Sequence, residues 1–146
     1  MQRSHEYFMK LALKEAVYAF EEDEVPIGAV VVCKNQVIGK GYNQVEKLTD
    51  VTAHAEMIAI TAASNYLGSK FLEECEIYVT VEPCLMCATA LRWARIGKII
   101  YGTGEPKTGF TTFQKTVLHP TTEIVGGVLE NECAELMRQF FKGKRL

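Results

Sequence analysis

Two short stretches of the sequence contain residue types that bind metals and move protons. The first is TAHAEMIAI, which begins at Thr52, and the second is VEPCLMCA, in which Pro83 precedes Cys84 and Cys87. Two cysteines three residues apart at the start of a helix place both sulfurs on one face, where the positive end of the helix dipole favours thiolates. The second stretch therefore predicts two sulfur ligands for a metal ion.

The number of further ligands distinguishes a catalytic metal site from a structural one. Catalytic zinc uses three protein ligands and leaves a position for water, whereas structural zinc takes a fourth protein ligand. Of the histidines His5, His54 and His119, only His54 is expected to begin a helix after a strand, as the cysteines do. We therefore predict His54 as the third ligand, with two helix N-termini converging on one zinc ion per chain.

Glu56 lies two residues beyond His54, and this spacing suggests a different role. A two-residue step turns about 200° around a helix, so the two side chains can approach one metal only if they straddle the first turn. Zinc lowers the pKa of a bound water from about 15.7 to about 7, and a nearby carboxylate can accept and return its proton. We expect Glu56 to be that carboxylate, a catalytic residue and not a ligand.

The first half of the chain predicts two helices and a hairpin that would carry these residues. Two β-branched runs are separated only by Lys34 and Asn35, which predicts a tight turn between strands. The hydroxyl of Thr52 is expected to cap the helix that follows. The expected elements are a helix from the N-cap Ser4 to about Phe20, strands at 27–33 and 36–42, and a helix from Thr52 to the stop signal Gly68.

The second half alternates strands with helices. We expect strands at 75–81, 98–102 and 122–125, a helix at 84–95, and a last helix with one apolar face. Alternation of this kind implies crossover connections and helices that cover a sheet. The fold class is therefore α/β, a three-layer α/β/α arrangement around a five-stranded mixed sheet, in a single domain spanning 1–146. The apolar face of the last helix is expected to hold Cys133, Leu136, Met137, Phe140 and Phe141. Adjacent helical residues point about 100° apart, so one of the two phenylalanines could instead pack on a partner or a base.

Composition excludes several classes of protein. No apolar run approaches the ~20 residues that a membrane helix needs, and five scattered cysteines in a chain of 146 residues favour reduced thiols, so we expect a cytoplasmic protein with no membrane contact. The net charge of −2 gives no global signature of a nucleic-acid binder. Basic residues are nevertheless concentrated at the C-terminus, at Arg138, Lys142, Lys144 and Arg145.

The motifs HAE at 54–56 and PCLMC at 83–87 resemble those of the zinc-dependent nucleobase deaminases. The wider sequence resembles, within that family, the bacterial tRNA-specific adenosine deaminases. The resemblance covers almost the whole chain and is carried by EVPIGAVVV, GYN, TAHAEMIAI, YVTVEPCLMCATAL, ARIGKIIYG, PKTGF and GVLENECAELMRQFF. It implies a cytidine deaminase-like fold.

The resemblance also implies a reaction and the residues that perform it. The expected reaction is hydrolysis of the wobble adenosine of a tRNA anticodon to inosine, with release of ammonia, by a homodimer. His54, Cys84 and Cys87 would bind zinc, Glu56 would shuttle protons, and Asn43 would hold the base through its amide.

Further substrate contacts are expected from a loop and from the C-terminal stretch. Glu105 falls in the substrate loop, where the tRNA enzymes most often have Asp, and the segment from Gly109 to His119 is shorter than in the longer members. The basic and aromatic C-terminus leads us to expect RNA contacts from Phe141, Lys144 and Arg145.

Other interpretations remain open from the sequence alone. Within enzymes, the alternative is a deaminase of a free base or nucleoside such as guanine or cytosine, because the zinc core would be the same. A non-enzymatic zinc module would need a fourth ligand from Cys33, Cys75 or Cys133, although these three fit core positions better. Asn43 could be a turn residue, and Glu82 could merely complement the dipole of the following helix.

Overall fold

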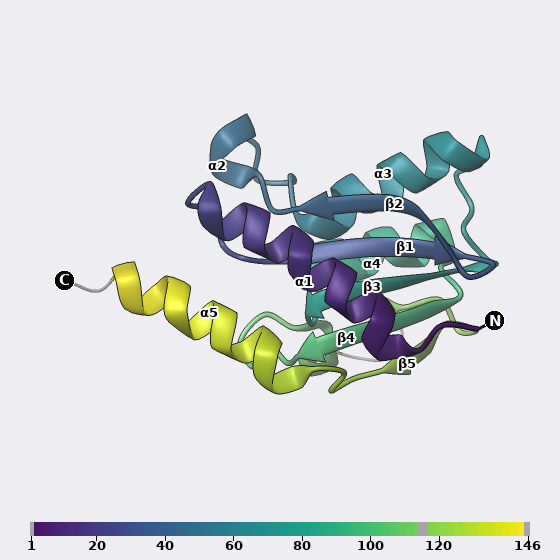
Figure 1. The fold of residues 1–146 in the computed structure, drawn as a ribbon. Helices are drawn as coiled ribbons and strands as arrows, with labels where there is room; N and C mark the ends of the chain where they lie inside the picture. The colour runs from purple at the N-terminus through teal and green to yellow at the C-terminus, as the bar shows by residue number, and fades with distance from the viewer. Residues whose placement is uncertain (1, 114–116, 145–146) are drawn as a thin grey trace.

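The computed structural model describes residues 2–113 and 117–144. A five-stranded sheet with the order β2-β1-β3-β4-β5 forms its centre (Figure 1). β1 pairs antiparallel with both β2 and β3, whereas β3, β4 and β5 run parallel to one another, so the sheet is mixed as expected. The strands are β1 (Gly28–Cys33), β2 (Gln36–Tyr42), β3 (Cys75–Val81), β4 (Lys98–Thr103) and β5 (Glu123–Val125).

Helices cover both faces of this sheet, which confirms the three-layer α/β/α prediction. One face packs against α3 and α4, and the other packs against α1 and α5, which lie in front of the sheet in Figure 1. The helices are α1 (His5–Glu21), α2 (Val45–Leu48), α3 (Ala55–Leu67), α4 (Leu85–Ala94) and α5 (Glu130–Lys144), and a 3-10 turn, η1, spans Phe110–Thr112.

The expected hairpin is present and has the expected turn chemistry. Lys34 and Asn35 connect β1 to β2, and both have positive φ angles, of 51° and 66°. A two-residue turn in which both residues have positive φ has a backbone twist that matches the twist of the two antiparallel strands it joins. The turn therefore sets β1 and β2 side by side with no intervening loop.

Small residues allow the helices to lie unusually close to the sheet. The buried face of α3 includes Ala55, Ala59 and Ala63, and a Cβ atom added to Gly41 of β2 would lie 2.6 Å from the carbonyl oxygen of Ala55. The same holds on the other face, where a Cβ atom at Gly28 would lie 2.1 Å from the carbonyl oxygen of Ala12 in α1. Direct backbone contact of this kind fixes where α3 begins relative to β2.

Several local expectations were wrong. Thr52 does not cap α3, because its hydroxyl donates to Asp50 Oδ1 at 2.7 Å, and His54 is the N-cap residue instead. The short helix α2 and the turn η1 were not expected, since neither segment has a periodic apolar pattern. On α5, Cys133 and Phe140 are buried as expected. Phe141 is 44% exposed, because adjacent helical residues point about 100° apart, and its ring is therefore left for the expected contact outside the core.

Among the described residues, no helix has the length and apolar character needed to cross a membrane.

Candidate active site

The ends of β2 and β3 bring the predicted metal ligands together. Both strands are antiparallel to β1, so they run parallel to each other, and their carboxyl termini lie at the same end of the sheet. His54 lies beyond β2 and the short helix α2 and is the N-cap residue of α3, and Cys84 follows β3 and is the N-cap residue of α4. Both residues have extended backbones, and neither side chain makes a capping hydrogen bond. Each side chain is therefore available to the space between the two helix N-termini.

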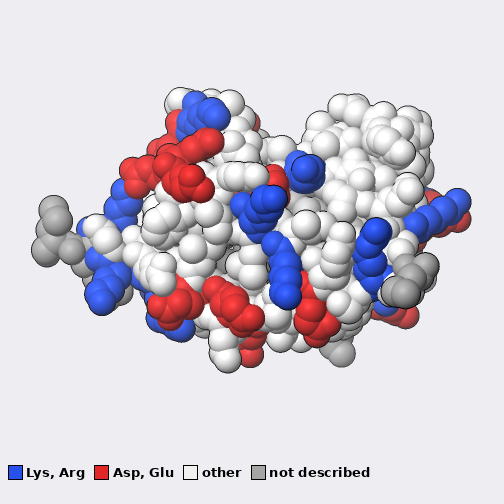
Figure 2. All heavy atoms as spheres, in the orientation of Figure 1, with Lys and Arg blue, Asp and Glu red and all other residues white. Residues whose placement is uncertain are grey.

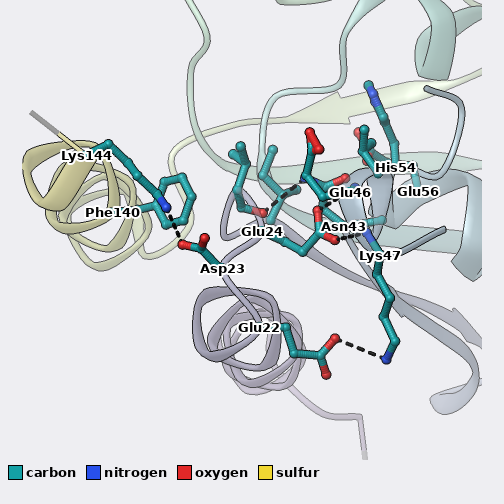
Figure 3. Close-up of a pocket in the computed structure, with 14 residues that line it drawn as sticks. Glu22, Asp23, Glu24, Asn43, Glu46, Lys47, His54, Glu56, Phe140 and Lys144 are labelled. Atoms are coloured by element: carbon teal, nitrogen blue, oxygen red, sulfur yellow. Dashed lines mark hydrogen bonds and ion pairs between the residues drawn. The ribbon is translucent and has the colours of Figure 1, made fainter. Parts of the chain in front are cut away.

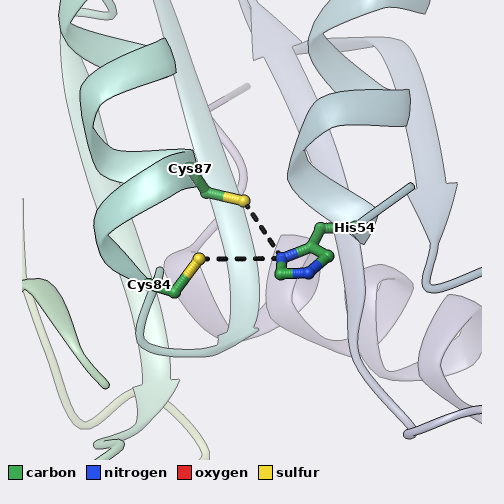
Figure 4. Close-up of side chains that lie close together, drawn as sticks. All are labelled: His54, Cys84 and Cys87. Atoms are coloured by element: carbon green, nitrogen blue, oxygen red, sulfur yellow. Dashed lines mark hydrogen bonds between the residues drawn. The ribbon is translucent and has the colours of Figure 1, made fainter. Parts of the chain in front are cut away.

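The three donor atoms converge within that space (Figure 4). His54 Nδ1 lies 3.6 Å from Cys84 Sγ and 3.4 Å from Cys87 Sγ. Zinc bonds of about 2.3 Å to sulfur and about 2.0 Å to nitrogen, at a tetrahedral angle, imply a nitrogen–sulfur separation of about 3.5 Å. The donor set and its spacing therefore fit a zinc ion held by these three side chains.

No fourth ligand joins this cluster within the described part of the chain. Cys33 and Cys75 lie at the opposite end of β1 and β3, and Cys133 belongs to the core on the other face of the sheet. Three protein donors with a free fourth position are the arrangement of a catalytic zinc, not of a structural one.

The two thiols of the cluster already differ in proton affinity without a metal. The hydrogen bond with Cys87 lowers the pKa of Cys84 to about 4, with a further contribution from His54. The pKa of Cys87 is raised, chiefly by its hydrogen bond with Cys84 and by burial. One sulfur is thus a thiolate at neutral pH, which favours capture of a cation.

Glu56 lies beside this cluster without belonging to it. It is in the first turn of α3, is 4% exposed, and its carboxyl group is within hydrogen-bonding reach of the Cys87 thiol. Burial raises the pKa of Glu56 to about 7 in the metal-free chain. A carboxyl group with a pKa near neutrality can both accept and release a proton, as a shuttle must.

A cleft of about 1160 Å³ opens over His54 and Glu56 (Figure 3). Asn43 lines it and is 7% exposed, and its amide nitrogen donates to the carbonyl oxygen of Val25 at 3.3 Å. The amide oxygen of Asn43 is buried and has no hydrogen-bond partner among the described residues. An unpaired buried acceptor is costly, so this oxygen marks a position where a ligand could donate a hydrogen bond.

The acidic run EEDE, at residues 21–24, contributes Glu22, Asp23 and Glu24 to the rim of this cleft. Glu24 is 1% exposed, and its carboxylate accepts hydrogen bonds from the backbone N–H groups of Glu46 at 3.1 Å and Lys47 at 2.7 Å. It therefore caps the N-terminus of α2. Glu22 pairs with Lys47 at 3.2 Å, and Asp23 pairs with Lys144 of α5 (Figure 3). These contacts hold the α2 segment and the end of α5 beside the cleft.

The predicted substrate contacts divide between two hollows. Asn43 and Lys144 line the cleft over Glu56, together with Phe140. Glu105 and Phe141 instead line a separate, mostly apolar hollow of about 850 Å³ between the end of β4 and α5. Arg145 lies outside the described residues.

Charge is mixed on the face of the molecule that α1 and α5 cover. Acidic and basic side chains are interspersed there, and basic side chains gather near the C-terminal end of α5 (Figure 2). At least two of the basic side chains of α5 have acidic partners: Arg138 pairs with Glu135 at 2.6 Å, and Lys144 pairs with Asp23.

Glu82 does more than complement the dipole of α4, because it binds the backbone of another loop. It is 6% exposed, and its carboxylate accepts hydrogen bonds from Glu105 N at 3.0 Å, Thr111 N at 2.7 Å and Thr111 Oγ1 at 2.5 Å. The backbone of the same loop also bonds to the turn before Cys84, because Phe110 N donates to Pro83 O at 2.9 Å. Glu82 therefore anchors the loop that carries Glu105 against the segment that leads to Cys84.

Comparison with known proteins agrees with this geometry. Residues 2–103 match the cytidine and deoxycytidylate deaminase zinc-binding region. A tRNA-specific adenosine deaminase of Agrobacterium fabrum is 45% identical over 150 residues, covering 99% of this chain and 97% of that protein.

Two solved structures are also similar. One comes from a study of A-to-I editing by tRNA:A34 deaminases at the wobble position, and its sequence is 44% identical to this chain. The superposition has a TM-score of 0.84 and includes 89% of this chain and 98% of the other chain. The other, a guanine deaminase of Bacillus subtilis, is 37% identical, covers 71% of this chain and 67% of its own, and has a TM-score of 0.68.

Proposed function

The chain belongs to the cytidine and deoxycytidylate deaminase zinc-binding family, and from this we propose that it hydrolyses the wobble adenosine of a tRNA anticodon to inosine and ammonia. The observation that supports the chemistry is a three-donor cluster with an open position beside the buried Glu56. Near full-length similarity to a tRNA-specific adenosine deaminase supports the choice of substrate.

His54, Cys84 and Cys87 would hold the zinc ion, which when bound supplies the Lewis acidity that makes water a nucleophile at neutral pH. Glu56 moves the protons. Addition of water at C6 of the purine places negative charge on N1, so Glu56 takes a proton from the attacking water and delivers it to N1. Glu56 then takes the remaining proton of the added hydroxyl group and delivers it to the exocyclic amine, which leaves as ammonia as the C6 carbonyl of inosine forms. One carboxylate therefore serves both transfers.

Asn43 would hold the base in the cleft. Its buried amide oxygen can accept a hydrogen bond from a ligand, while its amide nitrogen is held by Val25 O. A base that enters the cleft must leave its stack, which costs little in an anticodon loop, where it is already unpaired. Phe140 offers a ring at the side of the same cleft. Glu105 and Phe141, in the neighbouring hollow, remain candidates for contacts with other nucleotides of the loop.

We further propose that the chain acts as a homodimer in the cytoplasm. Support for a partner comes from α4, which leaves apolar side chains exposed while its small residue Ala88 is buried. Leu85 is 39% exposed and Trp93 is 78% exposed. Light scattering of the zinc-loaded protein at micromolar concentration should give twice the mass of one chain.

The deciding experiment measures the product in RNA and in free bases. The zinc-loaded protein is incubated with an anticodon stem-loop that carries adenosine at the wobble position, and with a matched stem-loop that carries it one position away. Inosine should form in the first RNA only. Efficient ammonia release from free guanine or cytosine, with no inosine in the RNA, would instead favour a free-base deaminase, as the similarity to the guanine deaminase allows.

A further inference from the structure

Cys33 and Cys75 face each other across neighbouring strands, at the end of the sheet opposite the zinc site. They are register partners in the antiparallel pair of β1 and β3. Cys75 N donates to Leu72 O at 3.0 Å, and Cys75 O accepts from Gly97 N at 3.0 Å, so the backbone polar groups of Cys75 point away from β1. The two cysteines therefore form a non-hydrogen-bonded pair, the kind in which facing side chains lie closest.

The spacing of such a pair suits a covalent bridge. Non-hydrogen-bonded partners have Cα atoms about 4.5 Å apart, and disulfides join Cα atoms separated by about 4.4–6.8 Å. The two thiols are already within hydrogen-bonding reach of each other. Both side chains lie on the face of the sheet that packs against α3 and α4. A bridge could thus form without moving either strand.

A reagent can also reach this pair. Both cysteines line a hollow of about 570 Å³ that opens between the hairpin and the segment after α3, with Tyr66 and Phe71 among its walls. Cys33 is half-buried and Cys75 is 2% exposed. Cys75 begins β3, whereas Cys84 follows its other end, so the whole length of the strand separates this hollow from the metal ligands.

We propose that Cys33 and Cys75 form a reversible dithiol–disulfide site, oxidised by a small disulfide such as oxidised glutathione. The Cys33 thiolate attacks one sulfur of the reagent, which forms a mixed disulfide at Cys33 and releases one thiolate. The Cys75 thiolate then attacks the Cys33 sulfur, which forms the Cys33–Cys75 bond and releases the second thiolate. Two protein thiols are oxidised and one reagent disulfide is reduced to two thiols.

The order of attack follows from the surroundings of the two residues. Burial, and after it the hydrogen bond with Cys33, raises the pKa of Cys75 to about 12, and Glu74 and Glu76 add to the effect. Cys33 is the more exposed of the two, so it meets the reagent first. Cys75 then acts as the resolving thiol, and its low thiolate fraction makes the second step the slower one.

The test uses the zinc-loaded protein, so that Cys84 and Cys87 are occupied, and it does not depend on deaminase activity. After treatment with oxidised glutathione, intact mass should fall by two hydrogens, and a non-reducing peptide map should join Cys33 to Cys75 with zinc content unchanged. A reducing agent should restore the original mass. Because the bridge constrains the unfolded chain, the Tm should also rise.

Variants separate this site from general thiol oxidation. Cys75→Ser should trap the glutathione adduct on Cys33, and Cys33→Ser should abolish the bridge. Cys133→Ser, which removes a buried thiol from the other core cluster, should oxidise like the wild type. The proposal is overturned if Cys33 and Cys75 stay unlinked, or if oxidation instead joins Cys84 or Cys87 and releases zinc.

Discussion

The side-chain ammonium of Lys144 pairs with the carboxylate of Asp23, and this contact joins the end of α5 to the loop after α1 at the rim of the Glu56 cleft. The Nζ atom of Lys144 also lies 5.4 Å from the centre of the Phe140 ring. The basic residue expected to meet RNA therefore already has an acidic partner. Both side chains remain partly exposed, so the pair stabilises the fold by about 1 kcal/mol at most.

A first prediction follows from this pair. Asp23→Asn should strengthen binding of an anticodon stem-loop several-fold, because the ammonium of Lys144 is released to meet phosphate. Lys144→Glu should weaken binding and reduce the slope of log Kd against log salt by about one. Fluorescence anisotropy over a salt series measures both. Lys34→Glu, in the turn at the far end of the sheet, is the control and should leave the slope unchanged.

The metal cluster provides a second prediction. Cys84→Ser or Cys87→Ser should reduce zinc from one equivalent to well below it, because hydroxyl oxygen is a poor ligand for this metal. Cys133→Ala should keep full zinc content, since that thiol packs in the opposite core. Metal analysis of purified protein gives the answer, and retention of zinc by both serine variants would contradict the assigned ligands.

Replacing Glu56 by Gln separates catalysis from metal binding. The side chains have nearly the same shape, so zinc content and Tm should stay close to wild type. Turnover should fall by a factor of about 10²–10⁴, because the amide cannot carry protons. Inosine formation under single-turnover conditions is the measurement, and near-normal turnover would remove Glu56 from the mechanism.

Asn43→Ala tests the unpaired oxygen in the cleft. Removing this acceptor should lower kcat/KM by about 10–100-fold, which corresponds to about 1–3 kcal/mol for a buried hydrogen bond. Zinc content should not change, because Asn43 is not part of the metal cluster. A variant with wild-type kcat/KM would show that Asn43 is only the turn residue its position allows.

Glu82 supplies a prediction about the loop that carries Glu105. Glu82→Ala should destabilise the fold by about 2–3 kcal/mol, because it leaves the backbone N–H groups of Glu105 and Thr111 without their acceptor. Thr111→Ala, which removes only the hydroxyl donor, should cost about 1 kcal/mol. Urea unfolding of the two zinc-loaded variants gives the comparison. If the two losses were equal, the Glu82 carboxylate would not be the anchor of this loop.

The sequence by itself determined the features that depend on neighbours along the chain. Three such local features are present in the structure. They are the spacing of Cys84 and Cys87 at the start of a helix, the turn at Lys34 and Asn35, and the N-cap at Ser4. The family motifs predicted the zinc chemistry for the same reason, since each motif lies within a few residues. Strand and helix periods were also sufficient to predict the mixed sheet and its helical layers.

Only the tertiary structure decided which distant residues meet. Because β2 and β3 are both antiparallel to β1, their ends place His54 beside Cys84, and the same pairing sets Cys33 against Cys75 at the other end. The tertiary structure also places the buried carboxylate of Glu24 at the N-terminus of α2, where it accepts hydrogen bonds from two backbone N–H groups. It divides the expected substrate residues between two hollows on either side of α5. These contacts depend on strand order and register, which are set by packing across the whole core and which a local pattern does not encode.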